Sequence, residues 1–531
     1  MKDQKFYLKQ NVIAEPLFNN WYAWPYLISP ATAAMYIANS HLKIMQSFVA
    51  TPQVHISALK NPAMIGGPFI NYDVSKVPQI KNLLEKTTKE QAALIELAGA
   101  IKTLENNLTN QAEGYSLESH YQNVPDALKG YVELVYDLNN NPSIRFIEGL
   151  LYKSPYYKQS SQSIALSLVE GDNRSFVFST PRLEDDKVLH LKIPFNSSVL
   201  DALFQMKYVP NSIDEIKAKL GISDKDEKLF TSFFTEEAPE KHPKYNGEDV
   251  RLRYFGHACV LIESKDVSIL CDPVISYNYD SSIDRYTFAD LPETIDYVLI
   301  THNHQDHCMF ETLLQLRHKI KNVIVPKNNG GALADPSLKL VLQNIGFNNV
   351  QEIDEMEFIN IQGGFITGLP FFGEHADLNI RSKIAFYVDL LGKSVLLAAD
   401  SNNIEPRMYK HIYDVLGKDI DILFLGMECD GGPLSWLYGS LLTKQLARKM
   451  DQSRRMDGSN FEKGISIVQQ LHPKHVYVYA MGQEPWLTYL TSIEYTEVSR
   501  PIVESNKMVD DCIMQGLIAE RLFGQKEILL S

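Results

Sequence analysis

Apolar residues in the first half of the chain follow two different periods. Between 77 and 108 they recur every three or four positions, which predicts a helical segment with one buried face. Between 163 and 193 they alternate with polar residues, in the stretches 164–168, 176–178 and 189–193. Turn-forming Gly, Asp and Asn residues separate these stretches. The pattern predicts an antiparallel meander, so we expect the first half to be α+β.

A long uncharged segment lies near the start of the chain. No charged residue occurs between Asn19 and Ser40, and Trp21–Tyr26 contains four aromatic residues. A membrane span needs roughly 20 apolar residues, but prolines at 25 and 30 interrupt this run. We therefore expect a buried aromatic segment, with an interaction surface as the alternative.

The segment Glu236–Asp249 combines two prolines, a glycine and many charged residues. This composition is typical of a linker. We therefore predict an α+β domain at 1–245 and a second domain at 246–531. A chain of 531 residues is long enough for at least two domains.

The second half is rich in short apolar stretches of strand length. Helical patterns such as Met309–His318 separate several of them. Strands and helices mixed in this way predict two sheets sandwiched between helices. The strand candidates are 250–263, 267–271, 297–301, 322–326, 364–369, 384–390, 394–398, 422–426 and 475–480.

The most informative motif is THNHQDH, which directly follows the apolar strand candidate at 295–300. It places three histidines and an aspartate close together in a chain with only 14 histidines. His302 and His304 are two residues apart, so an extended turn can direct both at one metal ion. Asp306 and His307 can then face a second metal ion beside it. The motif therefore predicts a dinuclear metal site.

This motif resembles the metal-binding signature of the metallo-β-lactamase superfamily. Residues 253–258 and 270–273 resemble the opening hairpin of that fold, and 397–401 resembles the strand that ends at its bridging aspartate. The resemblance covers about residues 250–490 and implies an αββα sandwich for the second domain.

Two departures from the superfamily pattern stand out. Where its hydrolases usually supply a third histidine to the first metal, this chain has Glu374 followed by His375, and we expect Glu374 to be the ligand. The usual final histidine is missing from 476–482. The expected metal ligands are His302, His304, Asp306, His307, Glu374 and Asp400.

A ligand set of three imidazoles and three carboxylates is harder than the usual hydrolase set. Hard, anionic ligands favour iron over zinc. An open coordination position suits oxygen activation, although a hydrolytic zinc pair needs one too. We therefore expect two iron ions, with a dinuclear zinc hydrolase as the alternative.

The second half is also similar to the dinuclear iron β-hydroxylases of nonribosomal peptide biosynthesis, particularly at 426–433 and 477–486. This resemblance implies O2-dependent hydroxylation at Cβ of an aminoacyl thioester on a carrier protein. It also implies an oxo-bridged iron pair and an external source of electrons. Asp400 would bridge the irons, and Glu374 would control access of O2. These two residues are the expected catalytic carboxylates.

Several other residues have two open interpretations. His257 either orients a metal ligand or is a structural histidine. Glu428 and Asp430 either bind a substrate amine or water, or form a turn. Cys308 is expected to be buried packing, because a thiolate would spoil an oxidising site. Three aromatic residues either wall the substrate or pack in the core: Trp436, Tyr438 and Trp486.

The charge and cysteine content set the expected surroundings. A formal net charge of −14 without a basic block argues against nucleic acid and anionic membranes as partners. Five cysteines without CxxC spacing favour reduced thiols in the cytoplasm. We expect residues 1–245 to mediate homodimerisation and carrier-protein docking, with 21–26 as a plausible contact surface.

Overall fold

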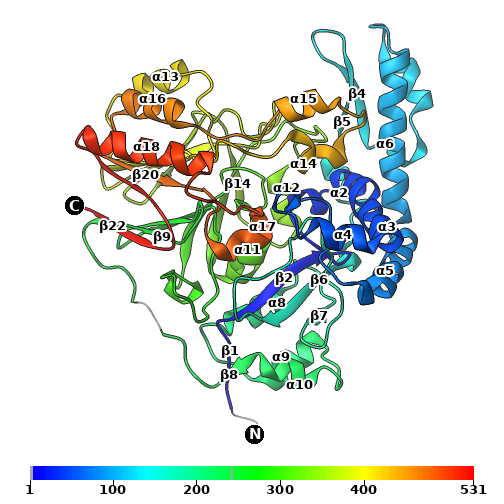
Figure 1. The fold of residues 1–531 in the computed structure, drawn as a ribbon, viewed down its shortest axis with the longest axis horizontal. Helices are drawn as coiled ribbons and strands as arrows, with labels where there is room; N and C mark the ends of the chain where they lie inside the picture. The colour runs from blue at the N-terminus through cyan, green and yellow to red at the C-terminus, as the bar shows by residue number, and fades with distance from the viewer. Residues whose placement is uncertain (1–3, 241–242) are drawn as a thin grey trace.

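The computed structural model describes residues 4–240 and 243–531. Residues 241 and 242, within the expected linker, lie outside the described residues. The N-terminal part packs against the helical layer of a larger two-sheet part (Figure 1). None of the helices in the described ranges is long and apolar enough to cross a membrane.

The N-terminal part contains a four-stranded sheet that the sequence predicted only in part. Its strands are, in order, β3 (Trp21–Tyr22), β2 (Val12–Phe18), β6 (Gln162–Leu168) and β7 (Leu189–Leu191). The antiparallel pair β6–β7 confirms the outer strands of the expected meander. The expected middle strand at 176–178 is wrong, because Phe178 lies in a turn and packs on Trp24, with ring centroids 5.2 Å apart. Strand β7 pairs directly with one edge of β6, and β2 pairs with its other edge.

Helices surround this sheet. The predicted helical segment at 77–108 is two helices, α5 and α6, which are separated at Gln91. Beyond α6, the hairpin β4 (Val132–Tyr136) and β5 (Pro142–Phe146) extends away from the main body (Figure 1). The helices are α1 (Pro25–Ile28), α2 (Pro30–Tyr36), α3 (Leu42–Ala50), α4 (Pro52–Ala58), α5 (Val77–Glu90), α6 (Ala92–Gln111), α7 (Glu148–Leu151), α8 (Ser198–Gln205), α9 (Ile213–Leu220) and α10 (Glu227–Ser232).

The aromatic segment 21–26 is buried, as the sequence predicted. Trp21, Trp24 and Tyr26 are each at most 1% exposed, and the rings of Trp24 and Tyr26 stack with centroids 4.6 Å apart. The alternative expectation of a contact surface is therefore wrong. These rings fill the core between the two parts of the chain and cannot reach a partner.

The second part confirms the predicted αββα sandwich. The first sheet consists of β14 (Val350–Ile353), β13 (Ile320–Pro326), β12 (Ile295–Leu299), β11 (Ser268–Cys271), β10 (Val260–Glu263), β9 (Val250–Tyr254) and β22 (Lys526–Leu530). The second sheet consists of β15 (Phe358–Ile361), β16 (Gly364–Leu369), β17 (Ala385–Leu390), β18 (Lys393–Leu397), β19 (Ile422–Gly426), β20 (His475–Tyr479) and β21 (Ile518–Arg521). Apolar side chains such as Ile262 and Phe386 pack between the sheets.

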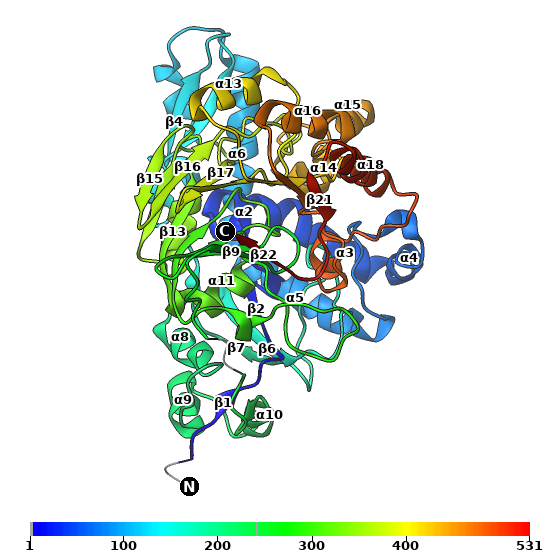
Figure 2. The same ribbon diagram turned by 90° about the vertical axis from the view of Figure 1, so that its left-hand side faces the viewer.

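Helices cover the outer faces of both sheets (Figure 2). On the first sheet α11 also packs against α8 of the N-terminal part, so the two parts share one apolar core. The helices are α11 (Phe310–Leu316), α12 (Leu338–Asn344), α13 (Arg407–Leu416), α14 (Leu434–Tyr438), α15 (Arg448–Ser453), α16 (Phe461–Leu471), α17 (Thr488–Thr491) and α18 (Arg500–Met514).

Candidate metal centre

The predicted metal-binding motif forms a loop between β12 and α11, at the carboxyl ends of the central strands. His302 and His307 are 0% exposed and His304 is 5% exposed. Their rings lie close together, since the centroids of His302 and His307 are 4.0 Å apart and those of His302 and His304 are 4.7 Å apart. Three buried imidazoles packed this closely need a shared role, and a metal site provides one.

Each imidazole is held through the nitrogen that faces away from the cluster. His307 Nδ1 lies 2.7 Å from Asp272 Oδ2, and His304 Nε2 lies 2.6 Å from the Tyr438 hydroxyl. His302 Nδ1 lies 3.0 Å from the Thr301 hydroxyl. The nitrogens left for metal binding are His302 Nε2, His304 Nδ1 and His307 Nε2. Such outer partners fix ring orientation and tautomer in metal sites.

Glu374 and Asp400 reach this cluster from the second sheet. Glu374, in the loop after β16, adopts a left-handed φ of 65° and places Oε2 3.0 Å from His304 Nδ1. Asp400 follows β18, and its Oδ2 lies 3.0 Å from His307 Nε2 and 3.7 Å from His302 Nε2. Asp400 therefore occupies the position between two donor groups that a bridging ligand requires.

Close packing allows Asp400 to take this position. A Cβ atom on Gly426, at the end of β19, would lie 2.7 Å from Asp400 Oδ1. Any larger residue at 426 would displace the carboxylate. The same Cβ would lie 2.6 Å from the Ala399 backbone oxygen, so Gly426 is required for the close approach of β19 to the segment that carries Asp400.

His375 lies beside Glu374 but faces the cluster differently. Its ring is 1% exposed and stacks on His304, with centroids 4.6 Å apart. Burial, reinforced by His304 and Lys383, lowers the pKa of His375 well below its ordinary value and keeps the ring neutral. The donor groups that converge within 4.8 Å include Glu374 and not His375.

His257 is a site residue, which favours the first of its two interpretations. It lines the cavity, and its Nε2 lies 3.3 Å from Asp306 Oδ2. Its Nδ1 accepts a hydrogen bond from the backbone N–H of Gly482 at 3.2 Å. A neutral ring in this arrangement carries its proton on Nε2, toward Asp306. This geometry suits orientation of Asp306 better than direct metal binding.

The donor atoms fit a pair of metal ions. Three groups of residues each have donor atoms that lie within 4.8 Å of one another. The groups are His302, His304 and Glu374; His302, His307 and Asp400; and His257, Asp306 and His307. In the first two groups four buried atoms have no hydrogen-bond partner: His302 Nε2, His307 Nε2, Glu374 Oε2 and Asp400 Oδ1. In the third group His257 Nε2 also has none. Buried polar atoms are normally paired, so these atoms indicate cation ligands.

The pKa values in the cluster are set by burial and by the close spacing of its charges. Burial opposes a charge on His307, but Asp400 and Asp272 outweigh it and raise the pKa of His307 well above its ordinary value. Burial, together with the nearby carboxylates of Asp400 and Asp306, raises the pKa of Glu374, although His304 opposes the shift. Burial and the neighbouring imidazoles lower the pKa of His302 well below its ordinary value, which leaves a neutral ligand. Burial opposes ionisation of Asp306, but His257 and His307 outweigh it and lower the pKa of Asp306. Neutral imidazoles and ionised carboxylates are the forms that bind metals.

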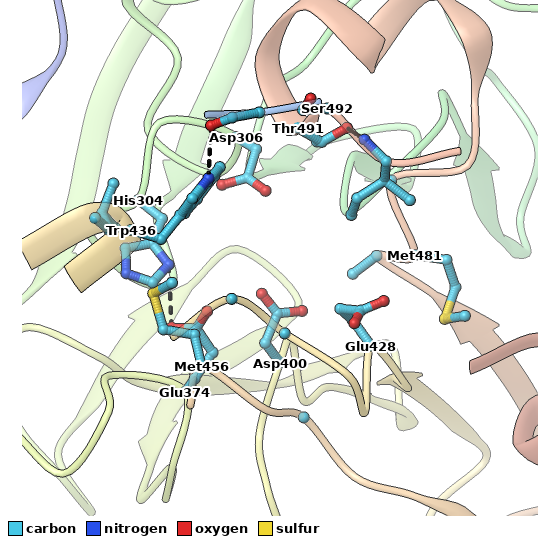
Figure 3. A pocket seen from close by; sticks show the side chains of 18 of the residues that line it. His304, Asp306, Glu374, Asp400, Glu428, Trp436, Met456, Met481, Thr491 and Ser492 are labelled. Atoms are coloured by element: carbon cyan, nitrogen blue, oxygen red, sulfur yellow. Dashed lines mark hydrogen bonds and ion pairs between the residues drawn. The ribbon is translucent and has the colours of Figure 1, made fainter. Parts of the chain in front are cut away.

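A cavity of about 360 Å³ opens beside the cluster (Figure 3). Ile65 and Gly66 of the N-terminal part contribute to its wall, and the backbone carbonyl of Gly66 accepts a hydrogen bond of 3.0 Å from Trp436 Nε1. Trp436 therefore walls the cavity, as one interpretation of the sequence suggested. Trp486 instead packs in the core beneath Arg285.

Residues of the N-terminal part also contact the metal-binding loop and the start of helix α11. Asn303 Nδ2 donates to the Tyr26 hydroxyl at 3.1 Å, and the Tyr22 hydroxyl donates to Glu311 Oε2 at 2.9 Å. Arg174 makes an ion pair of 2.8 Å with Glu311, the second residue of α11. The aromatic segment thus contacts both ends of the loop.

Several contacts of the site had no signal in the sequence, although Tyr438 and the aromatic segment were candidates for other roles. Tyr438 and Tyr26 reach the loop from distant segments, and neither belongs to a spaced motif. Asp272 lies in the stretch at 270–273 that resembles the superfamily, so the resemblance was its one available signal. Cys308 is fully buried as expected, and burial raises the pKa of its thiol.

Two sheets between helices, with imidazoles and carboxylates gathered at the strand ends, define a metal-binding protein of the metallo-β-lactamase class. In agreement, residues 251–426 match the beta-lactamase superfamily domain. Residues 7–239 match a domain family described as the diiron non-heme beta-hydroxylase N-terminal domain.

Two relatives match the whole chain. It is 39% identical to 4-amino-L-phenylalanyl-[CmlP-peptidyl-carrier-protein] 3-hydroxylase of Streptomyces venezuelae, over 99% of this chain and 100% of the relative. The crystal structure of CmlA, a diiron β-hydroxylase from the same species, matches with a TM-score of 0.93 and 40% identity, over 99% of this chain and 100% of that chain. The chain therefore belongs to the diiron non-heme β-hydroxylase family, and the zinc hydrolase alternative is not favoured.

Proposed function

We propose that the protein is an O2-dependent diiron monooxygenase that hydroxylates Cβ of an aminoacyl group. In this proposal the group is held as a thioester on a carrier protein of a nonribosomal peptide synthetase. The observation that carries it is the cluster of three imidazoles and three carboxylates beside a cavity of about 360 Å³. The match to a hydroxylase named for a carrier-bound substrate supports the substrate class.

In the proposed site His302, His304 and Glu374 hold one iron, Asp306 and His307 hold the other, and Asp400 bridges them. When bound, the iron pair supplies the activation of O2 and the oxidising power that removes hydrogen from Cβ. The residues of the chain fix the ligands, since Asp272 and Tyr438 hold two of the rings.

The electron balance of the reaction requires a further partner. One oxygen atom of O2 enters the substrate and the other leaves as water, which takes two electrons beyond those of the substrate. We propose that an external electron donor supplies them. We also propose a cytoplasmic location, which the five free, buried cysteines support.

A panel of carrier proteins tests the function. Each carrier is loaded with one L-amino acid, including 4-amino-L-phenylalanine, and incubated with the reduced iron-loaded protein and isotope-labelled O2. Mass spectrometry should find one labelled oxygen on at least one loaded carrier. Free amino acids should react poorly, because binding of the carrier supplies energy that positions Cβ. Equal turnover of the free amino acid would contradict the proposal.

The choice between neighbouring ligands is tested by two variants. Glu374→Ala should lose iron from the first position and lose most hydroxylation. His375→Ala should keep both irons. Its activity should stay within about tenfold of the wild type, which is the smallest loss usually seen when a residue beside the metal ligands is removed. Iron analysis of both purified variants decides, and the opposite order would show that His375 is the ligand.

We further propose that residues 1–245 mediate a homodimer and help to dock the carrier protein. The arm formed by α6 and the hairpin β4–β5 supports the first role, because it carries Tyr115 at 78% and Leu138 at 103% exposure. The double variant Tyr115→Asp/Leu138→Asp should sediment as a monomer at concentrations where the wild type is a dimer. A wild-type monomer, or a variant that remains dimeric, would contradict this role for the arm.

A further inference from the structure

Two acidic residues that line the cavity, Glu428 and Asp430, are not needed for the metal cluster. Glu428 lies two residues beyond β19 and is half-buried. It lines the same cavity as Asp400, and both carboxylates point into the open space (Figure 3). Met481 lies next to Glu428 in the cavity wall. The position places a second carboxylate beside the expected bridging ligand.

The side chain of Glu428 is held in place by its neighbours. Its Oε1 accepts a hydrogen bond of 3.0 Å from the backbone N–H of Asp430, and its Oε2 accepts one from the Tyr495 hydroxyl. Its backbone carbonyl accepts a bond of 2.6 Å from Gly458. An ionised carboxylate has about four acceptor sites. These contacts therefore fix the orientation and leave capacity for a donor in the cavity.

Glu428 also lacks a countercharge. In the described parts of the chain no lysine or arginine makes an ion pair with it, whereas the exposed Asp430 lies 3.4 Å from Arg455. Burial, together with Asp430 and Asp400, raises the pKa of Glu428 to about 8. A cation that enters the cavity would supply the missing charge.

A second polar group in the wall is also without a partner. Gln305, in the middle of the metal-binding loop, is 4% exposed and lines the cavity, and its Oε1 has no hydrogen-bond donor. A buried amide oxygen is normally paired. This amide oxygen can therefore accept a hydrogen bond from a donor group that enters the cavity.

We propose that Glu428 binds the α-ammonium group of the aminoacyl thioester and so selects aminoacyl over simple acyl substrates. The inference rests on the proposed function and assigns a specificity residue to it. In an amino acid the nitrogen and Cβ are about 2.5 Å apart, because both are bonded to Cα. An ammonium held beside Asp400 therefore keeps Cβ within about 2.5 Å of the bound nitrogen, and so close to the metal cluster. The side chain can then extend along Trp436 and Met456.

Binding of matched carrier proteins tests the assignment without turnover. One carrier is loaded with L-alanyl and the other with propionyl, and their affinities for the iron-loaded protein are measured without O2. The wild type should bind the alanyl carrier about 10- to 100-fold more tightly, as expected for a hydrogen bond to a charged group. In Glu428→Gln this preference should nearly vanish, while iron content and affinity for the propionyl carrier stay unchanged.

Two further variants complete the experiment. Asp430→Asn, in the same loop but paired with Arg455, should keep the full wild-type preference. Tyr495→Phe keeps the carboxylate but loses one hydrogen bond, so the preference should fall by about three- to tenfold. If Glu428→Gln does not fold, an unchanged preference in Tyr495→Phe overturns the inference.

The inference and the proposed function fail differently. A folded Glu428→Gln protein that still prefers the alanyl carrier overturns the inference, as does a wild type that binds both carriers equally. In both cases hydroxylation of a loaded carrier would leave the proposed function standing. If the wild type hydroxylates no loaded carrier, the proposed function fails, and this inference fails with it.

Discussion

The metal-binding loop at 301–307 and the aromatic segment at 21–26 touch each other but differ in how their roles can be recognised. The loop carries its chemistry in residue types and spacing, so its role is readable from seven consecutive residues. The aromatic segment has a composition that suits either a core or a partner surface. Its role follows from contacts, such as the bond of 3.1 Å from Asn303 to Tyr26.

This difference shows that the two segments fail in different ways when they are changed. Loss of a donor in the loop removes a metal ligand directly. Loss of a contact beneath the loop leaves every ligand in place and weakens their positioning. Four predictions test this separation, ordered from the largest expected effect to the smallest.

The largest effect is expected for Asp400→Ala. Because a bridging carboxylate serves two ions, the variant should lose both irons or their coupling. Loss of a residue that hydrogen-bonds a metal ligand costs up to about 100-fold in activity. Hydroxylation by Asp400→Ala should fall by more than this. Iron analysis and the optical spectrum of the purified protein measure this. Full iron content together with full activity would refute the ligand assignment.

A large effect on stability is expected for the buried ion pairs between the N-terminal part and helix α11. Arg174→Met breaks the buried ion pairs with Glu15 and Glu311, which measure 2.6 and 2.8 Å. Removal of one partner from a buried pair costs about 3–5 kcal/mol. Urea unfolding measures the free energy of unfolding. Arg145→Met, which breaks the exposed pair with Glu133, is the control and should cost less than about 1 kcal/mol.

The same ion pairs predict a pH dependence. Burial alone would raise the pKa of Glu15, but Arg182 and Arg174 outweigh it and lower the pKa from 4.5 to about 2. A lowered pKa stabilises the fold above 4.5, and this stability is lost as the pH falls from 4.5 toward 2. The contribution is about 3 kcal/mol.

Unfolding of the wild type and of Glu15→Gln at a series of pH values measures this contribution. The variant should be less stable at neutral pH and should lose less stability between about pH 5 and pH 3. Parallel pH profiles would show that Glu15 does not titrate in this range.

The smallest effects are expected for single hydroxyl groups. Tyr438→Phe removes the partner of His304 Nε2 and should weaken iron binding by about tenfold. Tyr26→Phe removes a contact one step further from the ligands, so it should cost about 1 kcal/mol of stability and leave iron affinity nearly unchanged. Titration with a chelator compares the iron affinities. A larger loss in Tyr26→Phe would mean that the aromatic segment, and not the outer partner, controls the site.

The sequence by itself determined the αββα class and the loop of the metal site. Strands β16 and β19 have the bounds that the sequence predicted. Strand β19 is a continuous apolar run buried on both faces, and β16 is buried along its last four residues. The donors of the loop were also predictable, since neighbouring residues on one turn converge without help from other segments.

Only the tertiary structure decided the features that depend on distant segments. The stretch at 176–178 has the alternation of a strand but runs into a turn, because both edges of β6 are already paired, one with β7 and the other with β2 from the start of the chain. In the same way, Asp272, Tyr438 and Tyr26 meet the loop only after both sheets and the N-terminal part have packed. Glu428 became a candidate for the substrate amine for the same reason. Packing brings Asp400 close to Glu428. Among the described residues, no lysine or arginine makes an ion pair with Glu428.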